Sequence, residues 1–207
     1  RGTYCHTMSI PGLFHFDLLQ PDFSFLDGLP ITHLIIASAA NASLDKTGEH
    51  WEESYQTNYL GVQRLLEECF RRGIMPIYLS SDGGFDGLKG DYCEEDDRIP
   101  VNKYGQIRKE VEDFLRSSKR QFLILRIGRV FDTEQNSTTL LMGLKKDLQA
   151  GLTLKVAVDQ WFTPIHLDDL FFLLHFLLQK KCVGIYHLAS LSRISRFDLA
   201  QAIKQFF

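Results

Sequence analysis

The chain has 207 residues, of which 44% are hydrophobic and 24% are charged, as in an ordinary globular domain with a sizeable core. Its formal net charge of −3 at pH 7 gives no sign of a nucleic-acid or anionic-membrane partner. The four cysteines form no C-x-x-C, which argues against a zinc site or a disulfide framework and favours a reducing, cytoplasmic compartment. The histidines show no H-x-x-x-H pairing, so we expect no metal site. The longest apolar run, residues 167–178, is too short and too often interrupted by polar residues to span a bilayer.

The first third of the chain predicts short strands followed by one long helix. Residues 2–7 and 13–18 are short β-prone runs separated by Pro and Gly. Residues 33–38 form a continuous apolar run, typical of a strand buried on both faces of a parallel sheet. Residues 49–72 predict an amphipathic helix that Gly73 ends.

The rest of the chain continues the alternation of strands and helices. Further strands are expected at residues 76–79, 122–126, 153–158 and 184–188, and further helices at 104–118, 138–150, 167–180 and 196–207. We therefore expect a Rossmann-like, doubly wound α/β fold with a largely parallel sheet. A single NAD(P)-binding domain would span residues 1–207, with residues from about 132 to 207 contributing a small C-terminal substrate lobe.

Two neighbouring motifs carry the chemistry. The strand at 76–79 ends in Ser80 and Ser81, and the helix at 104–118 begins at Tyr104 with Arg108 one turn later. A hydroxyl at the carboxyl end of a strand and a Tyr near a basic residue on a helix can face one pocket. Such an arrangement can move a proton to or from a carbonyl oxygen while a hydride moves at its carbon.

These motifs resemble those of the extended short-chain dehydrogenase/reductases, and among them the dTDP-4-dehydrorhamnose reductases. That family carries S-T-D-Y-V-F-D-G, then E-x-D, then P-x-x-x-Y-G-x-x-K. This chain has S-S-D-G-G-F-D-G at residues 80–87, then Glu94 and Asp96, then Pro100 and Tyr104-Gly105. The resemblance implies an NADP- or NAD-dependent reductase that acts on a keto group of a sugar or a nucleotide sugar.

The resemblance assigns the catalytic roles to Ser81, Tyr104 and Arg108. Tyr104 would donate the proton, Ser81 would hold the carbonyl oxygen, and Arg108 would bias Tyr104 electrostatically. A phenol has an ordinary pKa of about 10 and needs a nearby cation to act near neutrality. Arg108 stands where the family has its catalytic Lys. It keeps the charge and the spacing, but its guanidinium is planar and differs in shape from the ammonium of Lys. A site that is present but chemically weakened therefore stays an alternative.

The cofactor-binding positions are also implied by the resemblance: Asp17, Leu18, Ala37, Ser38, Ala39, Asn58, Ser80, Tyr104, Arg108 and Ile127. Asp17-Leu18 matches the pair that follows the family's third strand. The run beginning at Ala37 matches the family's N-A-A-A, where small side chains let a dinucleotide lie against the strand end. Each match has a plainer alternative, since small residues also let a helix pack closely and a buried Asn can satisfy a neighbouring carbonyl.

The substrate-binding positions implied are Ser81, Asp82, Arg129, Gln160 and Trp161. Arg129 could pair with a diphosphate or with an acidic loop. Trp161 could stack on a base or a sugar, or belong to the core. Gly83 replaces a family Tyr and would open the pocket wall.

An alternative from another functional class stays open. The chain begins at Arg1 without a G-x-x-G-x-x-G, and residues 2–7 match the second strand of a Rossmann sheet better than the first. We expect the first strand and the phosphate loop to lie upstream of Gly2. With Arg108 and Ala37 in place of the family's Lys and Asn, this supports a non-catalytic binding or regulatory subunit, as in methionine adenosyltransferase.

The third alternative is an epimerase or dehydratase of the same superfamily. The sequence favours a reductase over it only because the motifs match those of the reductases more closely. The sequence does not determine the oligomeric state, for which a homodimer is one option.

Overall fold

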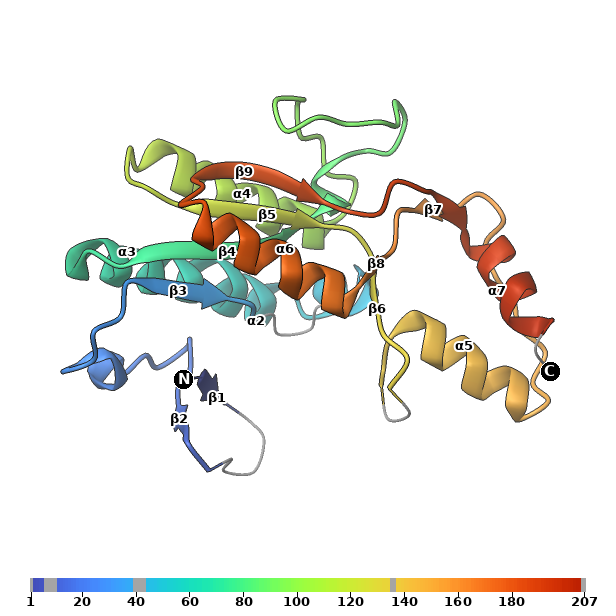
Figure 1. Cartoon of the computed structure of the whole chain (residues 1–207), viewed down its shortest axis with the longest axis horizontal. Helices are drawn as coiled ribbons and strands as arrows, with labels where there is room; N and C mark the ends of the chain where they lie inside the picture. Colours follow the sequence, from blue (N-terminus) through green and yellow to red (C-terminus); the bar gives the residue numbers. More distant parts are fainter. Residues whose placement is uncertain (1, 6–10, 39–43, 135–136, 206–207) are drawn as a thin grey trace. The chain divides into compact units, whose positions relative to one another are not determined.

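Figure 1 presents the computed structural model of the chain, which describes residues 2–5, 11–38, 44–134 and 137–205. The chain divides into two compact units. The first comprises residues 1–125 and 183–186, and the second comprises residues 126–182 and 187–207.

The central sheet has four strands in the order β3 (His33–Ile36), β4 (Met75–Ser81), β5 (Leu123–Ile127) and β9 (Gly184–Leu188). β3 and β4 are parallel, with His33 opposite Met75. All four arrows point the same way in Figure 1. The expected parallel, Rossmann-like α/β fold is therefore confirmed.

The helices of the first unit that follow β3 are α1 (Leu44–Glu49), α2 (Trp51–Tyr55), the π-helix η2 (Gln56–Gly61), α3 (Val62–Arg72) and α4 (Lys103–Ser117). The single helix expected at 49–72 thus consists of three consecutive segments. A Cβ at Gly61 would lie 2.7 Å from the carbonyl oxygen of Leu18, so only glycine permits this close approach. Gly73 ends α3 with a left-handed φ of 70°.

The core of the first unit lies between the sheet and its helices. Ile36, Tyr78 and Ile124 come from three adjacent strands and share one core cluster. The cluster also holds residues of the two long helices: Val62, Leu65, Leu66 and Cys69 of α3, with Val111 and Leu115 of α4. Apolar residues at helical spacing pack here on one sheet face, which fixes how β4 and α4 lie against each other.

The amino-terminal strands form a sheet of their own. β1 (Gly2–Tyr4) and β2 (Leu13–His15) pair in parallel, and the 3₁₀ helix η1 (Phe23–Leu26) follows. Within the described ranges β3 is hydrogen-bonded only to β4. Ile35 is 46% exposed, so the expectation that residues 33–38 are buried on both faces is wrong. Ile35 points to the sheet face opposite the core cluster that Ile36 joins, because successive side chains of a strand alternate between the two faces.

The second unit contains α5 (Leu140–Gln149), α6 (Leu167–Gln179) and α7 (Arg196–Lys204). Its strands are two residues long. β6 (Val130–Phe131) pairs in parallel with β8 (Ile165–His166), and β7 (Trp161–Phe162) pairs antiparallel with β10 (Ile194–Ser195). The strand expected at 153–158 is wrong, because these residues form a mostly exposed loop without ladder partners. His166 caps α6 and accepts the N–H of Asp168 at 3.2 Å.

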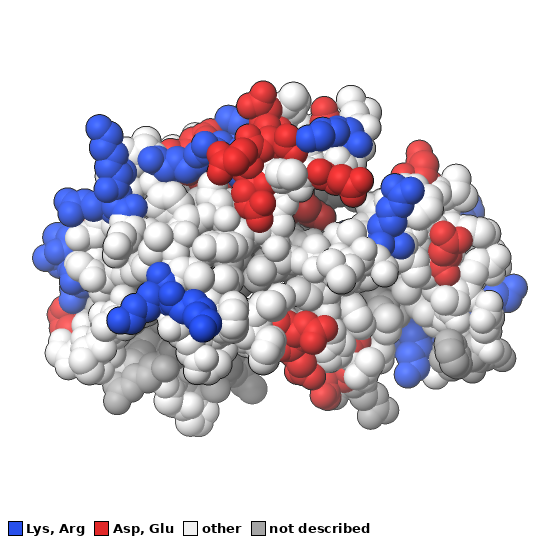
Figure 2. All heavy atoms as spheres, turned by 45° about the horizontal axis from the view of Figure 1, so that its top comes forward, with Lys and Arg blue, Asp and Glu red and all other residues white. Residues whose placement is uncertain are grey.

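The surface carries charges of both signs. Figure 2 shows basic and acidic side chains on the same face, and neither sign covers it. No helix within the described ranges combines the length and apolar character needed to cross a membrane. Across those same ranges, no group of three His, Cys, Asp or Glu side chains could hold a metal ion. None of the four cysteines, all of which lie within the described ranges, forms a disulfide bond.

Candidate active site

The start of α4 brings the two motifs together. Asn102 caps the helix by accepting the N–H of Gly105 at 2.8 Å. A Cβ at Gly105 would lie 1.9 Å from the carbonyl oxygen of Gly83. The turn η3 (Asp82–Gly84), which follows β4, therefore contacts the first turn of α4 directly. This contact holds Tyr104 beside the end of β4.

Ser81 and Tyr104 face each other across Gly83. A Cβ at Gly83 would lie 3.5 Å from Ser81 Oγ and 3.5 Å from Cδ1 of the Tyr104 ring. Ser81 Oγ accepts the N–H of Gly83 at 3.1 Å and donates to Asp82 Oδ1 at 3.0 Å. Ser81 Oγ and the Tyr104 ring thus lie close to the same glycine, which puts no side chain between them.

Arg108 lies buried behind Tyr104, with a relative exposure of 6%. Its Cζ is 4.9 Å from the centroid of the Tyr104 ring. Its Nη1 donates to the hydroxyl of Tyr78 at 2.9 Å and to the carbonyl oxygen of Leu79 at 3.4 Å. Burial opposes the charge of the guanidinium, but Tyr78 and Tyr104 offset that cost, and the pKa of Arg108 lies above its ordinary value. Arg108 is therefore a permanent cation next to Tyr104.

A buried polar network lies behind Ser81. Ser80 Oγ donates to Glu112 Oε1 at 2.5 Å, and Arg98 Nη1 donates to Glu112 Oε2 at 3.0 Å. The side chains of Arg98 and Glu112 are only 7% and 2% exposed. The hydroxyl of Ser80 is thus hydrogen-bonded within the core, so Ser80 would contact a cofactor through its backbone.

Sequence reasoning missed Tyr78, Arg98 and Glu112. One signal was available for Glu112: it falls within the apolar stripe of the helix, beside Val111 and one turn before Leu115. A carboxylate in a buried stripe requires a partner. Nothing in the sequence indicated which residues would meet it.

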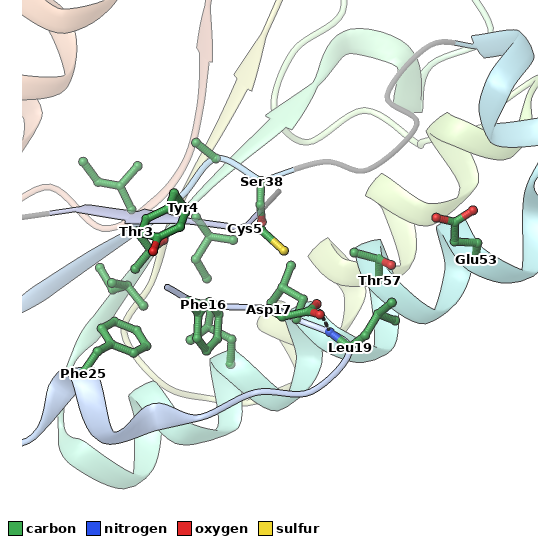
Figure 3. A pocket seen from close by; sticks show the side chains of 16 residues that line it. Thr3, Tyr4, Cys5, Phe16, Asp17, Leu19, Phe25, Ser38, Glu53 and Thr57 are labelled. Carbon is green, nitrogen blue, oxygen red and sulfur yellow. Dashed lines mark hydrogen bonds between the residues drawn. The ribbon is translucent and has the colours of Figure 1, made fainter. Parts of the chain in front are cut away.

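A pocket of about 520 Å³ gathers four of the expected cofactor residues, Asp17, Leu18, Ala37 and Ser38 (Figure 3). This volume lies in the range of small-molecule sites. The Asp17 carboxylate accepts the N–H of Leu19 at 2.8 Å. Among the described residues that line the pocket, Asp17 and Glu53 carry carboxylates and none carries a cation.

The remaining cofactor positions lie apart from this lining. Asn58 is buried within the π-helix η2, and Ile127 is buried at the end of β5. Ala39 lies outside the described residues.

The other expected substrate residues belong to the second unit. Gln160 Oε1 accepts from Arg196 Nη1 at 3.1 Å. Trp161 is 52% exposed, and the guanidinium carbon of Arg193 lies 4.9 Å from its ring centroid. Trp161 therefore does not belong to the core, which was one of its two readings. The Arg129 side chain is exposed.

The parallel sheet, its helices and the cluster of Ser81, Tyr104 and Arg108 define a Rossmann-like α/β protein with a hydroxyl–phenol–cation site. The family model described as the RmlD substrate binding domain matches residues 29–207. The chain belongs to this family, and its resemblance to the dTDP-4-dehydrorhamnose reductases is confirmed.

Individual relatives agree with this assignment. The chain is 31% identical over 191 residues to a dTDP-4-dehydrorhamnose reductase of Aggregatibacter actinomycetemcomitans, covering 87% of this chain and 63% of that protein. It is 27% identical over 186 residues to methionine adenosyltransferase 2 subunit beta of Bos taurus, covering 84% of this chain and 54% of that protein. The chain thus spans less than two-thirds of the length of these curated relatives.

Solved structures share the fold. A hypothetical dTDP-4-dehydrorhamnose reductase from Sulfolobus tokodaii superposes with a TM-score of 0.84 at 29% identity, covering 100% of this chain and 73% of that chain. Structures of the same fold at 20% and 17% identity were determined in complex with NADP and NAD, respectively.

Proposed function

We propose that this chain works as an NAD(P)H-dependent reductase of a keto group on a nucleotide sugar or a related sugar. The observation that carries the proposal is the closeness of Ser81 Oγ and the Tyr104 ring, since both would lie 3.5 Å from a Cβ at Gly83. The guanidinium carbon of the buried Arg108 lies 4.9 Å from the centroid of that ring. A substrate carbonyl bound beside Gly83 would have a hydroxyl, a proton donor and a positive charge nearby.

The chain's own residues divide the work as follows. Ser81 turns its hydroxyl from Asp82 toward the carbonyl oxygen and holds it. Tyr104 donates the proton to that oxygen as negative charge develops there. Arg108 stabilises the phenolate that Tyr104 leaves behind, because its positive charge is fixed and poorly screened by water. Gly83 leaves room for the carbonyl, and Asp82 is a candidate contact for the sugar.

The residues around Asp17 fit one end of the cofactor. A carboxylate beside small, exposed side chains at Ala37 and Ser38 suits the hydroxyls and amine of an adenosine. The described lining supplies no cation for a diphosphate, so the phosphates would need groups from elsewhere. When bound, NADPH or NADH supplies the hydride. We propose that the cofactor is NADP or NAD, that Arg129, Gln160 and Trp161 bind the substrate, and that the protein acts in the cytoplasm.

A second candidate is a binding or regulatory subunit with the same fold. The observation that favours it is the match to methionine adenosyltransferase 2 subunit beta over 186 residues, together with the acidic pocket lining. In that case the cluster at Tyr104 would contribute to stability but not to turnover.

A product assay separates the two candidates. The protein, with any residues upstream of Arg1 included, is incubated with NADPH or NADH and a panel of 4-keto nucleotide sugars, and the sugars are analysed by mass spectrometry. We expect one substrate to gain two hydrogens in step with cofactor oxidation. The proposal fails if no substrate is reduced at millimolar cofactor, and binding of the chain to a methionine adenosyltransferase catalytic subunit in the same preparation would favour the subunit.

A further inference from the structure

Tyr78 is a buried residue that the proposed chemistry leaves unused. It lies on β4, its relative exposure is 0%, and its ring belongs to the core cluster between the sheet and the helices. An apolar core gains nothing from a phenolic hydroxyl unless that hydroxyl has a partner. Its partner is Nη1 of Arg108, 2.9 Å away.

The two tyrosine rings flank the same guanidinium. The Cζ atom of Arg108 lies 5.5 Å from the centroid of the Tyr78 ring and 4.9 Å from that of the Tyr104 ring. Nη1 also points to the carbonyl oxygen of Leu79, at 3.4 Å. One nitrogen is thus tied to β4 by two acceptors, while the remainder of the group lies next to Tyr104.

The shape of the arginine side chain makes this anchoring effective. A guanidinium is planar and presents its donors in fixed directions, so holding one nitrogen also restricts the orientation of the whole plane. A lysine ammonium is a compact point charge with three rotatable donors and would not be oriented in this way.

We propose that Tyr78 is a positioning residue: its hydroxyl fixes the Arg108 guanidinium against the Tyr104 ring. The consequence for turnover rests on the proposed reductase function, whereas the positioning itself does not. The contact through which Tyr78 acts is its hydrogen bond with Arg108. Arg108 and Tyr78 therefore form a functional pair that the sequence motif around Tyr104 does not contain.

The direct test observes the Tyr104 ring without any substrate or cofactor. The chain is prepared with ring-labelled ¹³C-tyrosine, and the Tyr104 resonances are assigned by their loss in Tyr104→Phe. In Tyr78→Phe we expect them to move toward the positions that they take in Arg108→Met. The matched control is Tyr59→Phe on η2, which removes a half-buried hydroxyl from the same unit and should leave them in place. Unchanged Tyr104 resonances in Tyr78→Phe would overturn the proposal.

A measurement on the unmodified chain covers the case in which Tyr78→Phe does not fold. Nuclear Overhauser contacts from the Arg108 guanidinium protons to both rings are expected. Their absence from either ring would overturn the proposal.

Kinetics then separates positioning from mere stability. With an active reductase, Tyr78→Phe should lower kcat by about ten- to a hundredfold while KM stays unchanged. In an Arg108→Met background it should lower kcat no further. Full additivity of the two losses would contradict action through Arg108. If the unmodified chain reduces no substrate, the proposed function fails, and the resonance experiment still decides the positioning role.

Discussion

Two regions of the first unit differ in how many of the polar groups that a functional site needs are provided by the described residues. Around Tyr104, the buried polar groups find partners in the chain: Arg108 binds Tyr78, and Glu112 binds both Ser80 and Arg98. Around Asp17, the pocket is open, its small side chains are exposed, and its described lining is acidic. The region proposed for proton transfer is thus preorganised by the described residues, whereas the region proposed for the dinucleotide has no cation for the phosphates in its described lining.

Ser80 and Ser81 give the largest contrast within the first region, because adjacent hydroxyls serve different purposes. Ser81→Ala should lower kcat by about 10²–10³-fold, since it removes the hydrogen bond to the carbonyl oxygen, and should leave the melting temperature nearly unchanged. Ser80→Ala should instead destabilise the fold by about 1–3 kcal/mol, because Glu112 loses a buried donor. Steady-state kinetics and urea unfolding of both variants make the comparison. Equal effects of the two variants on kcat would remove the distinction.

Arg98→Met tests the network behind Ser80. It leaves the charge of Glu112 buried without its cation, so the free energy of unfolding should fall by about 3–5 kcal/mol. The matched control is Lys89→Met, which removes an exposed ion pair with Asp96 in the same loop and should cost about 1 kcal/mol or less. Urea titrations give both values. A loss for Arg98→Met no larger than that for Lys89→Met would show that this network contributes little.

Gly105→Ala tests the contact that brings η3 against α4. The new methyl group would lie 1.9 Å from the carbonyl oxygen of Gly83, so backbone must shift, at a cost of about 1–3 kcal/mol. Turnover should fall as well, because Gly83 and Ser81 move away from Tyr104. The control is Gly143→Ala in α5, where nothing lies within 4 Å of the added Cβ. That variant should gain about 0.5–1 kcal/mol, and a similar gain for Gly105→Ala would contradict the close approach.

The smallest expected effect lies at Glu68 on α3. Hydrogen bonds from Arg71 and then Arg72 lower the pKa of Glu68 from its ordinary value of 4.5 to about 2. Because this pKa is lowered by folding, the stabilisation is present above about pH 4.5 and is lost as the pH falls toward 2.

Replacing this carboxyl should therefore make the melting temperature depend less on pH in the acid range. Glu68→Gln should lower the melting temperature by roughly 2–4 °C at pH 7, since its partners are at the surface, and by less at pH 2. Glu67→Gln serves as the control, because it replaces an exposed carboxyl that accepts a hydrogen bond from Gln63. An effect of Glu68→Gln that does not depend on pH would argue against this ion pair.

Local patterns were sufficient to predict the elements that carry the candidate site. The apolar run of β4, the helical spacing in α4 and the four-residue interval from Tyr104 to Arg108 are all properties of short segments. The cluster of Ser81, Tyr104 and Arg108 followed from a resemblance to known motifs, and the structure brings these residues together.

Features that depend on contacts between distant segments could not be predicted. The partnership of Tyr78 with Arg108 depends on how β4 lies against α4, and the π-helix depends on the approach of Gly61 to Leu18. The paired strands of the second unit are two residues long, too short to show an alternating pattern. The strand expected at 153–158 had suitable residues but no partner, and β propensity alone does not make a strand.

The central claim is that Tyr104 is the proton donor of a carbonyl reduction. Tyr104→Phe removes a single hydroxyl from a half-buried ring, so its melting temperature should match that of the unmodified chain. The decisive measurement is the rate of cofactor oxidation with the substrate that the unmodified chain reduces, under conditions that saturate both. We predict that Tyr104→Phe lowers this rate by about 10²–10⁴-fold. Turnover by Tyr104→Phe as fast as that of the unmodified chain would contradict the assignment.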